Sequence, residues 1–133
     1  MELVSFFGIK IAVGKKRELL SSAMELIGKG GGIFTPNCLM VAQAHENGAF
    51  GELFSFSSIN VPDGVGLAIL LRRYGIKSDV LSGVELGELL LGGRSFAIIG
   101  GADGRAELAA KSLEKSMQKP LFPLYKIFTN LSF

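Results

Sequence analysis

Short apolar runs that stop at glycine-rich or proline-containing turns are the feature of this sequence that most restricts its fold. Glycine supplies 18 of the 133 residues, about twice its usual share of roughly 7%. The glycines follow no period and cluster where apolar runs end. This distribution is typical of the turns of α/β proteins, and it argues against a collagen-like or linker-like chain.

Between these turns, strand-like and helix-like segments alternate. We expect strands within residues 4–13, 33–35, 54–61 and 95–99, and helices over residues 15–27, 38–47, 65–74, 83–91 and 105–117. Strands that alternate with helices predict a largely parallel sheet with helices on both faces. The expected fold class is therefore α/β, with a single domain built on a Rossmann-like sheet.

Three of the predicted helices carry expectations of their own. Asn37 is a good N-cap for the helix over residues 38–47. Residues 65–74 are apolar nearly all round, so we expect this helix to be buried. Ser82 and Glu85 have the spacing of a capping box, in which Ser82 caps the helix and the Glu85 side chain returns to the Ser82 amide.

The charge and cysteine content argue against several classes of protein. With 14 basic and 12 acidic residues and no stripe of Lys and Arg, the chain lacks the profile of a nucleic-acid-binding protein. The single cysteine, Cys38, excludes an intrachain disulfide and fits a reducing compartment. No apolar run reaches the ~18 residues of a membrane span, and the start of the chain lacks the basic residues of a secretory signal. We therefore expect a cytoplasmic protein.

The chain is apolar for its size, with 48% hydrophobic residues and a mean hydropathy of +0.40. We expect the surplus apolar surface to be covered by a subunit interface in a homo-oligomer, by a membrane surface or by a further part of the fold. Residues 120–133 hold two prolines and several aromatic residues without a helical or strand period. We therefore expect a core domain over residues 1–119, an atypical apolar tail over residues 120–133, and a missing C-terminal part. A tail that lies along the surface is the alternative.

Candidate chemistry lies in three turns that follow predicted strands: residues 35–37, 62–64 and 100–104. Ligands of open parallel sheets bind outside the carboxyl ends of the strands. Each turn also opens a helix, and the free amides of a helix start favour a phosphate group. These turns are therefore the expected places for a phosphorylated substrate.

Each turn also has a purely structural interpretation. Asp63 is a candidate general base, but Val-Pro-Asp-Gly is also ordinary turn chemistry in which Asp63 caps the next helix. The glycines of residues 100–104 suit a diphosphate, but they also suit a tight turn with Asp103 as N-cap. Thr35 and Asn37 have side chains that suit a sugar or a diphosphate, while Asn37 also suits a helix cap.

A metal site is not expected from the sequence. His45 is the only histidine, and no second His or Cys stands at a ligand spacing from it. The glycine loop also differs from the G-x-G-x-x-G pattern of dinucleotide sites and from the P-loop. We therefore expect neither a bound metal nor a dinucleotide cofactor.

Taken in order and spacing, the motifs resemble those of the WecG/TagA/CpsF glycosyltransferases. The matching segments are IFTPN at residues 33–37, VPDGVG at 61–66, SGVEL at 82–86, and IIGG at 98–101 followed by Gly104. The resemblance covers residues 30–119, and the Pro-Asp-Gly-x-Gly block after a Thr-x-Asn block is its most specific part.

The resemblance implies an inverting transfer of N-acetylmannosamine, or a related sugar, from a UDP-sugar. The acceptor would be N-acetylglucosamine on a polyprenyl diphosphate at the inner face of the cell membrane, in the synthesis of surface polysaccharide or teichoic acid. It implies that Asp63 is the base that deprotonates the acceptor hydroxyl. It implies these substrate-binding residues: Thr35, Asn37, Gly64, Gly83, Gly100, Gly101 and Gly104. It implies no metal, and the sequence contains no D-x-D motif.

Several positions depart from the family pattern. Val80 stands where members usually carry an arginine, and Glu85 stands where they usually carry an aspartate. The later Gly-x-Pro-x-Gln-Glu segment of the family is absent. Two other hypotheses therefore stay open beside the enzyme: a non-catalytic module that binds nucleotide sugars, and a structural α/β domain that oligomerises.

Overall fold

The computed structural model describes residues 1–91, 96–101, 103–116 and 127–128. The chain divides into two compact units, Met1–Leu86 and Gly87–Phe133, and each is described by itself. The boundary predicted between residues 119 and 120 lies outside the described residues, as does the predicted tail apart from residues 127–128.

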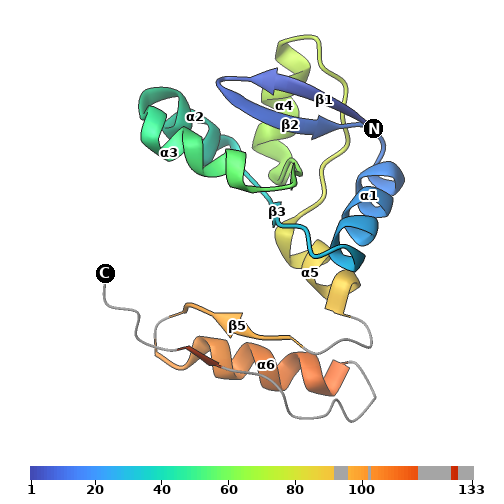
Figure 1. Ribbon diagram of the computed structural model, residues 1–133, viewed down its shortest axis with the longest axis vertical. Coiled ribbons are helices and arrows are strands. Elements are labelled where there is room, and N and C mark those ends of the chain that lie inside the picture. The colour runs from blue at the N-terminus through green and yellow to red at the C-terminus, as the bar shows by residue number, and fades with distance from the viewer. Residues whose placement is uncertain (92–95, 102, 117–126, 129–133) are drawn as a thin grey trace. The chain divides into compact units, whose positions relative to one another are not determined.

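The first unit begins with a β-hairpin (Figure 1). Strand β1, Glu2–Phe6, pairs antiparallel with β2, Ile9–Val13, in the register Glu2 to Val13 and Phe6 to Ile9. Phe7 and Gly8 form the two-residue turn, with φ of 47° and 85°. Positive φ at both turn residues matches the right-handed twist of the paired strands. The sequence segment 4–13 therefore contains two strands.

A parallel βαβ unit follows the hairpin. Helix α1, Lys16–Gly28, leads to strand β3, Ile33–Phe34, which pairs in parallel with β4, Ile59–Asn60. The crossover contains α2, Cys38–Glu46, α3, Gly48–Glu52, and a 3₁₀ turn η1, Leu53–Phe56. The strand predicted over residues 54–61 is thus mostly wrong, because its first half is the 3₁₀ turn.

Asn60 ties β4 to the hairpin. Its side chain is buried, and its Nδ2 donates to the Lys10 carbonyl at 2.9 Å and to the Phe54 carbonyl at 3.0 Å. Its Oδ1 accepts from the Ser57 hydroxyl at 2.9 Å. A buried amide stays stable only when such bonds are made. Asn60 therefore joins β4, β2 and η1 through side-chain hydrogen bonds.

A hydrophobic core cluster of the first unit lies between the hairpin, α2 and α4, Gly64–Arg73. Figure 1 shows α4 crossing behind the hairpin. The buried members of this cluster are Phe6, Ile9, Ile11, Val13, Val41, Ala44, Phe54, Leu67 and Leu71. Only Leu67 and Leu71 are buried on α4, whereas Val65 is 70% exposed and Ile69 is 64% exposed. The prediction that this helix is buried on all sides is therefore wrong.

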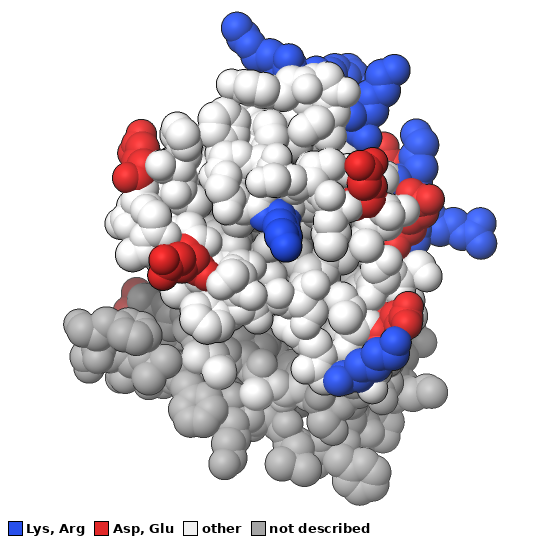
Figure 2. All heavy atoms as spheres, turned by 45° about the horizontal axis from the view of Figure 1, so that its top comes forward, with Lys and Arg blue, Asp and Glu red and all other residues white. Residues whose placement is uncertain are grey.

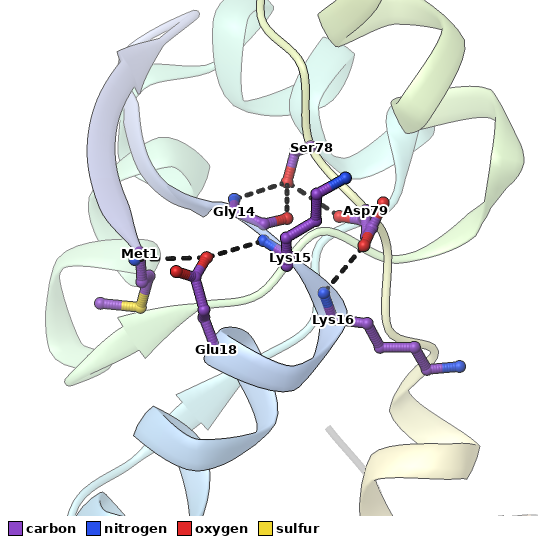
Figure 3. A network of polar contacts seen from close by, with 7 residues as sticks. All are labelled: Met1, Gly14, Lys15, Lys16, Glu18, Ser78 and Asp79. Carbon is purple, nitrogen blue, oxygen red and sulfur yellow. Dashed lines mark hydrogen bonds and ion pairs between the residues drawn. The ribbon is translucent and has the colours of Figure 1, made fainter.

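Ser78 and Asp79, in the segment after α4, lie beside Gly14 at the end of β2 (Figure 3). The Asp79 amide donates to the Gly14 carbonyl at 2.9 Å, and the Gly14 amide donates to the Ser78 hydroxyl at 3.0 Å. The Asp79 carboxylate accepts from the Lys16 amide at 2.9 Å. These bonds fix the segment between α4 and α5, Gly83–Leu91, against the start of α1.

The second unit contains β5, Ile98–Ile99, α6, Arg105–Ser116, and β6, Ile127–Phe128, with β5 and β6 parallel. Together the described strands form three two-stranded sheets. Over the described residues the fold is thus mixed α/β, and these residues do not form the large Rossmann-like parallel sheet expected from the sequence. Two-residue strands give short ladders, and the two-residue turn at Phe7 and Gly8 makes the first pair antiparallel.

Much of the surface of the described residues is uncharged. Figure 2 shows one face on which Lys and Arg side chains lie mainly at the top and right margins, with one basic side chain near the centre surrounded by uncharged residues. Among the residues described, no helix has both the length and the apolar character needed to cross a bilayer.

We predict that Asn60→Ala lowers the free energy of unfolding by about 2 kcal/mol, because it removes three side-chain hydrogen bonds that are buried or partly buried. Urea unfolding followed by circular dichroism measures this change. Ser21→Ala, at an exposed position on α1, is the control and should change stability by less than about 0.5 kcal/mol. Equal stability of the Asn60 variant and the wild type would contradict the structural role of Asn60.

Candidate active site

Three chain segments meet at the carboxyl ends of β3 and β4. The parallel pairing continues past the strands, since the Val61 amide donates to the Phe34 carbonyl at 2.8 Å and the Asp63 amide to the Pro36 carbonyl at 2.9 Å. The Leu81 amide then donates to the Pro62 carbonyl at 3.0 Å. These bonds bring together the starts of α2, α4 and α5, so three helix starts lie beside one another at this edge.

Asp63 stands at the N-cap position of α4 but makes no side-chain bond to that helix. Its Oδ2 instead accepts from the amide of Gly83, the first residue of α5, at 3.3 Å. The simple interpretation of Asp63 as a helix cap is therefore wrong. The carboxylate is half-buried and faces a neighbouring helix start, where the helix dipole favours negative charge.

Thr35, the residue after β3, lies next to Gly83 at the start of α5. A Cβ atom added to Gly83 would lie 2.6 Å from the Thr35 hydroxyl oxygen, closer than real contacts allow. Position 83 therefore requires glycine if Thr35 is to keep its place. The structure thus brings Thr35, Asp63 and Gly83 into one cluster.

Asn37 acts as the predicted cap of α2. Its Oδ1 accepts from the Met40 amide at 3.0 Å. Within the described residues, its Nδ2 group has no hydrogen-bond partner. The cap role is confirmed, and the remaining N–H groups are able to donate to a ligand at this edge.

The start of α4 lies against the start of α2. Gly64 has a φ of +81°, which favours glycine. A Cβ on Gly66 would lie 2.9 Å from the Cys38 sulfur, so Gly66 permits the two helix starts to approach. This contact was not predicted from the sequence, although the second glycine of the Asp-Gly-x-Gly block is a signal for it.

The start of α5 corrects one predicted detail. The Ser82 hydroxyl accepts from the Glu85 amide at 3.1 Å, so Ser82 caps the helix as expected. The Glu85 carboxylate does not return to the Ser82 amide, because it pairs with the Lys16 ammonium at 2.6 Å. The reciprocal half of the capping box is therefore replaced by a contact with α1.

The glycine loop belongs to the second unit and is described with that unit alone. Gly100, Gly101 and Gly104 have φ values of +106°, +77° and +74°, and Asp103 has a φ of +57°. The Gly104 carbonyl accepts from the Leu108 amide at 3.1 Å, so Gly104 occupies the capping position expected of Asp103. Ala102 lies outside the described residues. The backbone is therefore left-handed at the described residues on both sides of Ala102, just before α6.

Within the described part of the chain, no group of three or more His, Cys, Asp and Glu residues is arranged to hold a metal ion. The His45 ring lies edge-on to the Phe7 ring, with centroids 5.0 Å apart. The Cys38 thiol is exposed at the first position of α2. Carboxylate, hydroxyl and amide groups, together with helix starts, thus make up the chemistry available around Asp63.

The sequence matches the protein-family model described as "Glycosyl transferase WecG/TagA/CpsF family" over residues 4–122. This range includes all the residues of the Asp63 cluster and the glycine loop. No curated protein matches the chain.

We predict that Gly83→Ala destabilises the first unit by about 1–3 kcal/mol, because the new methyl group overlaps the Thr35 hydroxyl. Thermal unfolding measures the change. Gly87→Ala is the matched control in the same helix, since a Cβ there meets nothing within 4 Å. It should raise stability by about 0.5–1 kcal/mol. The double variant Thr35→Ala/Gly83→Ala should recover part of the loss, and no recovery would contradict this contact.

Proposed function

The chain belongs to the WecG/TagA/CpsF family of glycosyltransferases, and from this premise we propose that it transfers N-acetylmannosamine, or a related sugar, from a UDP-sugar. The proposed acceptor is N-acetylglucosamine on a polyprenyl diphosphate at the cytoplasmic face of a membrane. The product would serve the synthesis of a surface polysaccharide or a teichoic acid.

The orientation of the Asp63 carboxylate is the observation that best supports this proposal. A helix cap would be turned toward its own helix, whereas Asp63 is turned toward Gly83 and the Thr35 side of the cluster. One oxygen is held by the Gly83 amide, and within the described residues the other has no hydrogen-bond partner. A carboxylate held in this way suits a general base.

In the proposed reaction, the free Asp63 oxygen takes the proton of the acceptor hydroxyl. The acceptor oxygen then attacks the anomeric carbon of the donor sugar from the face opposite UDP. The bond from that carbon to the diphosphate breaks, and UDP leaves with the electron pair. One displacement of this kind inverts the anomeric configuration.

The leaving diphosphate requires positive partial charge. The clustered starts of α2, α4 and α5 supply backbone amides near Asp63. For the second unit taken by itself, we propose that the loop of Gly100, Gly101 and Gly104, with its positive φ values at the start of α6, binds a phosphate group of the nucleotide. Thr35 and the Asn37 amide are assigned to sugar hydroxyls. No step of the proposed reaction requires a metal.

We predict that Asp63→Asn lowers the rate of sugar transfer by about 10²–10⁴-fold, because the amide cannot accept the acceptor proton. The measurement is UDP release from UDP-N-acetylmannosamine in the presence of a synthetic lipid-linked acceptor. Glu46→Gln, an exposed carboxylate at the far end of α2, is the control and should keep the wild-type rate. A wild-type rate in the Asp63 variant would exclude Asp63 as the base.

We also predict that UDP raises the midpoint of thermal unfolding of the wild type and of Asp63→Asn alike, because a ligand that binds only the folded state stabilises it. Gly101→Val should reduce this ligand-induced rise, since a side chain at position 101 meets the Ala106 amide and the Arg105 side chain at 3.3 Å. Each rise is compared with the ligand-free midpoint of the same variant. A folded wild type without any rise at millimolar UDP would count against the nucleotide site.

A further inference from the structure

Helix α4 has a second apolar face that the core does not use. Leu67 and Leu71 point into the core, one turn apart. Val65, Ala68, Ile69 and Arg72 follow the i, i+3, i+4, i+7 spacing of a separate helix face. Val65 and Ile69 on this face are 70% and 64% exposed. A soluble helix normally keeps such a face polar, so this one calls for a partner.

This second face lines a hollow of about 720 Å³ in the first unit. The other walls are the end of β2 with the start of α1, and the segment over residues 76–79 that follows α4. Ile76 adds to the apolar floor, and the backbone bonds of Gly14 with Ser78 and Asp79 hold the walls together (Figure 3). The hollow thus has an apolar floor and walls that are joined by backbone hydrogen bonds.

The basic and acidic side chains around the hollow differ in whether they already have partners. Lys15, Arg72 and Lys77 line it, and within the described residues their side chains make no ion pair. The two acidic residues of the lining are already engaged. The Glu18 carboxylate contacts the amino terminus at 3.5 Å and the Lys15 amide at 2.9 Å, and Asp79 accepts from the Lys16 amide (Figure 3). Since the amino terminus offsets one of the two carboxylates, the three basic side chains leave the lining with a net positive charge.

We propose that the outer face of α4 docks on an anionic lipid surface. This face is defined as Val65, Ala68, Ile69 and Arg72 of the helix, together with Ile76 and Lys77 of the segment that follows it. A membrane offers apolar volume for Val65 and Ile69 and negative head groups for the basic rim at the same time. A second copy of this chain would bring the same positive rim against itself, and like charges would repel. A nucleic acid would leave the apolar floor without a partner.

The location of this face gives it a role in the proposed sugar transfer, on which this part of the inference rests. Asp63 directly precedes α4, and Val65 is the second residue of that helix. Docking of the α4 face would therefore hold the base close to the lipid surface that carries the acceptor. The acceptor would then meet Asp63 without leaving the membrane.

Co-sedimentation with vesicles tests the docking without any sugar substrate. The full chain should bind vesicles of phosphatidylcholine mixed with phosphatidylglycerol, bind phosphatidylcholine alone much less, and lose binding as salt rises. Arg72→Gln/Lys77→Gln should weaken binding to the anionic vesicles by about 30-fold. Lys10→Gln/Lys29→Gln removes the same charge from exposed positions outside this face and should have a much smaller effect.

The apolar part of the face has its own matched pair. Ile69→Ser should weaken vesicle binding by about tenfold, whereas Leu108→Ser, at a similar exposure of 66% on α6, should not. Equal losses in the two members of either pair, or no binding of the wild type to anionic vesicles at low salt, would overturn the proposal. A change in oligomeric state by light scattering for Ile69→Ser with unchanged vesicle binding would assign the face to a second copy and also overturn it.

Asp63→Asn should bind vesicles like the wild type, so the docking and the sugar transfer are tested separately.

Discussion

The backbone bonds that continue beyond β3 and β4 are the constraint on which the rest of the first unit depends. The strands themselves pair through only two residues each. The bonds from Asp63 to Pro36 and from Leu81 to Pro62 carry the alignment three residues further, through prolines whose side chains are fully buried. Proline lacks an N–H, so these positions serve only as acceptors. The extended alignment places three helix starts at one edge, where negative groups are favoured.

Close approach at this edge depends on the absence of side chains at two glycines. Gly83 admits the Thr35 hydroxyl, and Gly66 admits the Cys38 sulfur. With the helix starts this close, the Asp63 carboxylate finds the first amide of α5 rather than an amide of its own helix. The contact with Gly83 thus replaces the usual N-cap bond of Asp63, and the carboxylate oxygen that it leaves without a partner among the described residues is the one that we propose as the base.

Helix α4 connects the core, the candidate site and the outer surface. Its inner stripe, Leu67 and Leu71, anchors it beneath the hairpin. Its start follows Asp63, and its outer stripe forms the floor of the basic hollow. Because one short rigid element carries all three, the position of Asp63 relative to the outer face of α4 is fixed by the helix itself. Because α4 has one apolar face in the core and another on the hollow, residues 65–74 are apolar without being buried on every side.

The sequence by itself determined those features whose hydrogen bonds join residues a few positions apart. The caps Asn37 and Ser82 each bond an amide three residues later, and the helices they start were predicted close to their observed bounds. The motif order also identified the family, because it depends on residue types and spacing alone. The three strand-to-helix turns were correctly placed along the chain for the same reason.

Tertiary structure alone decided the contacts between residues far apart in the sequence. Glu85 pairs with Lys16, 69 positions away, instead of completing its capping box, and Asp63 bonds Gly83, 20 positions away, instead of capping α4. The short length of the strands and the exposure of the outer face of α4 likewise depend on which segments lie beside them. A local sequence pattern indicates which hydrogen bonds a residue is able to make. Which of the possible partners it bonds depends on the segments that the fold of the whole chain places beside it.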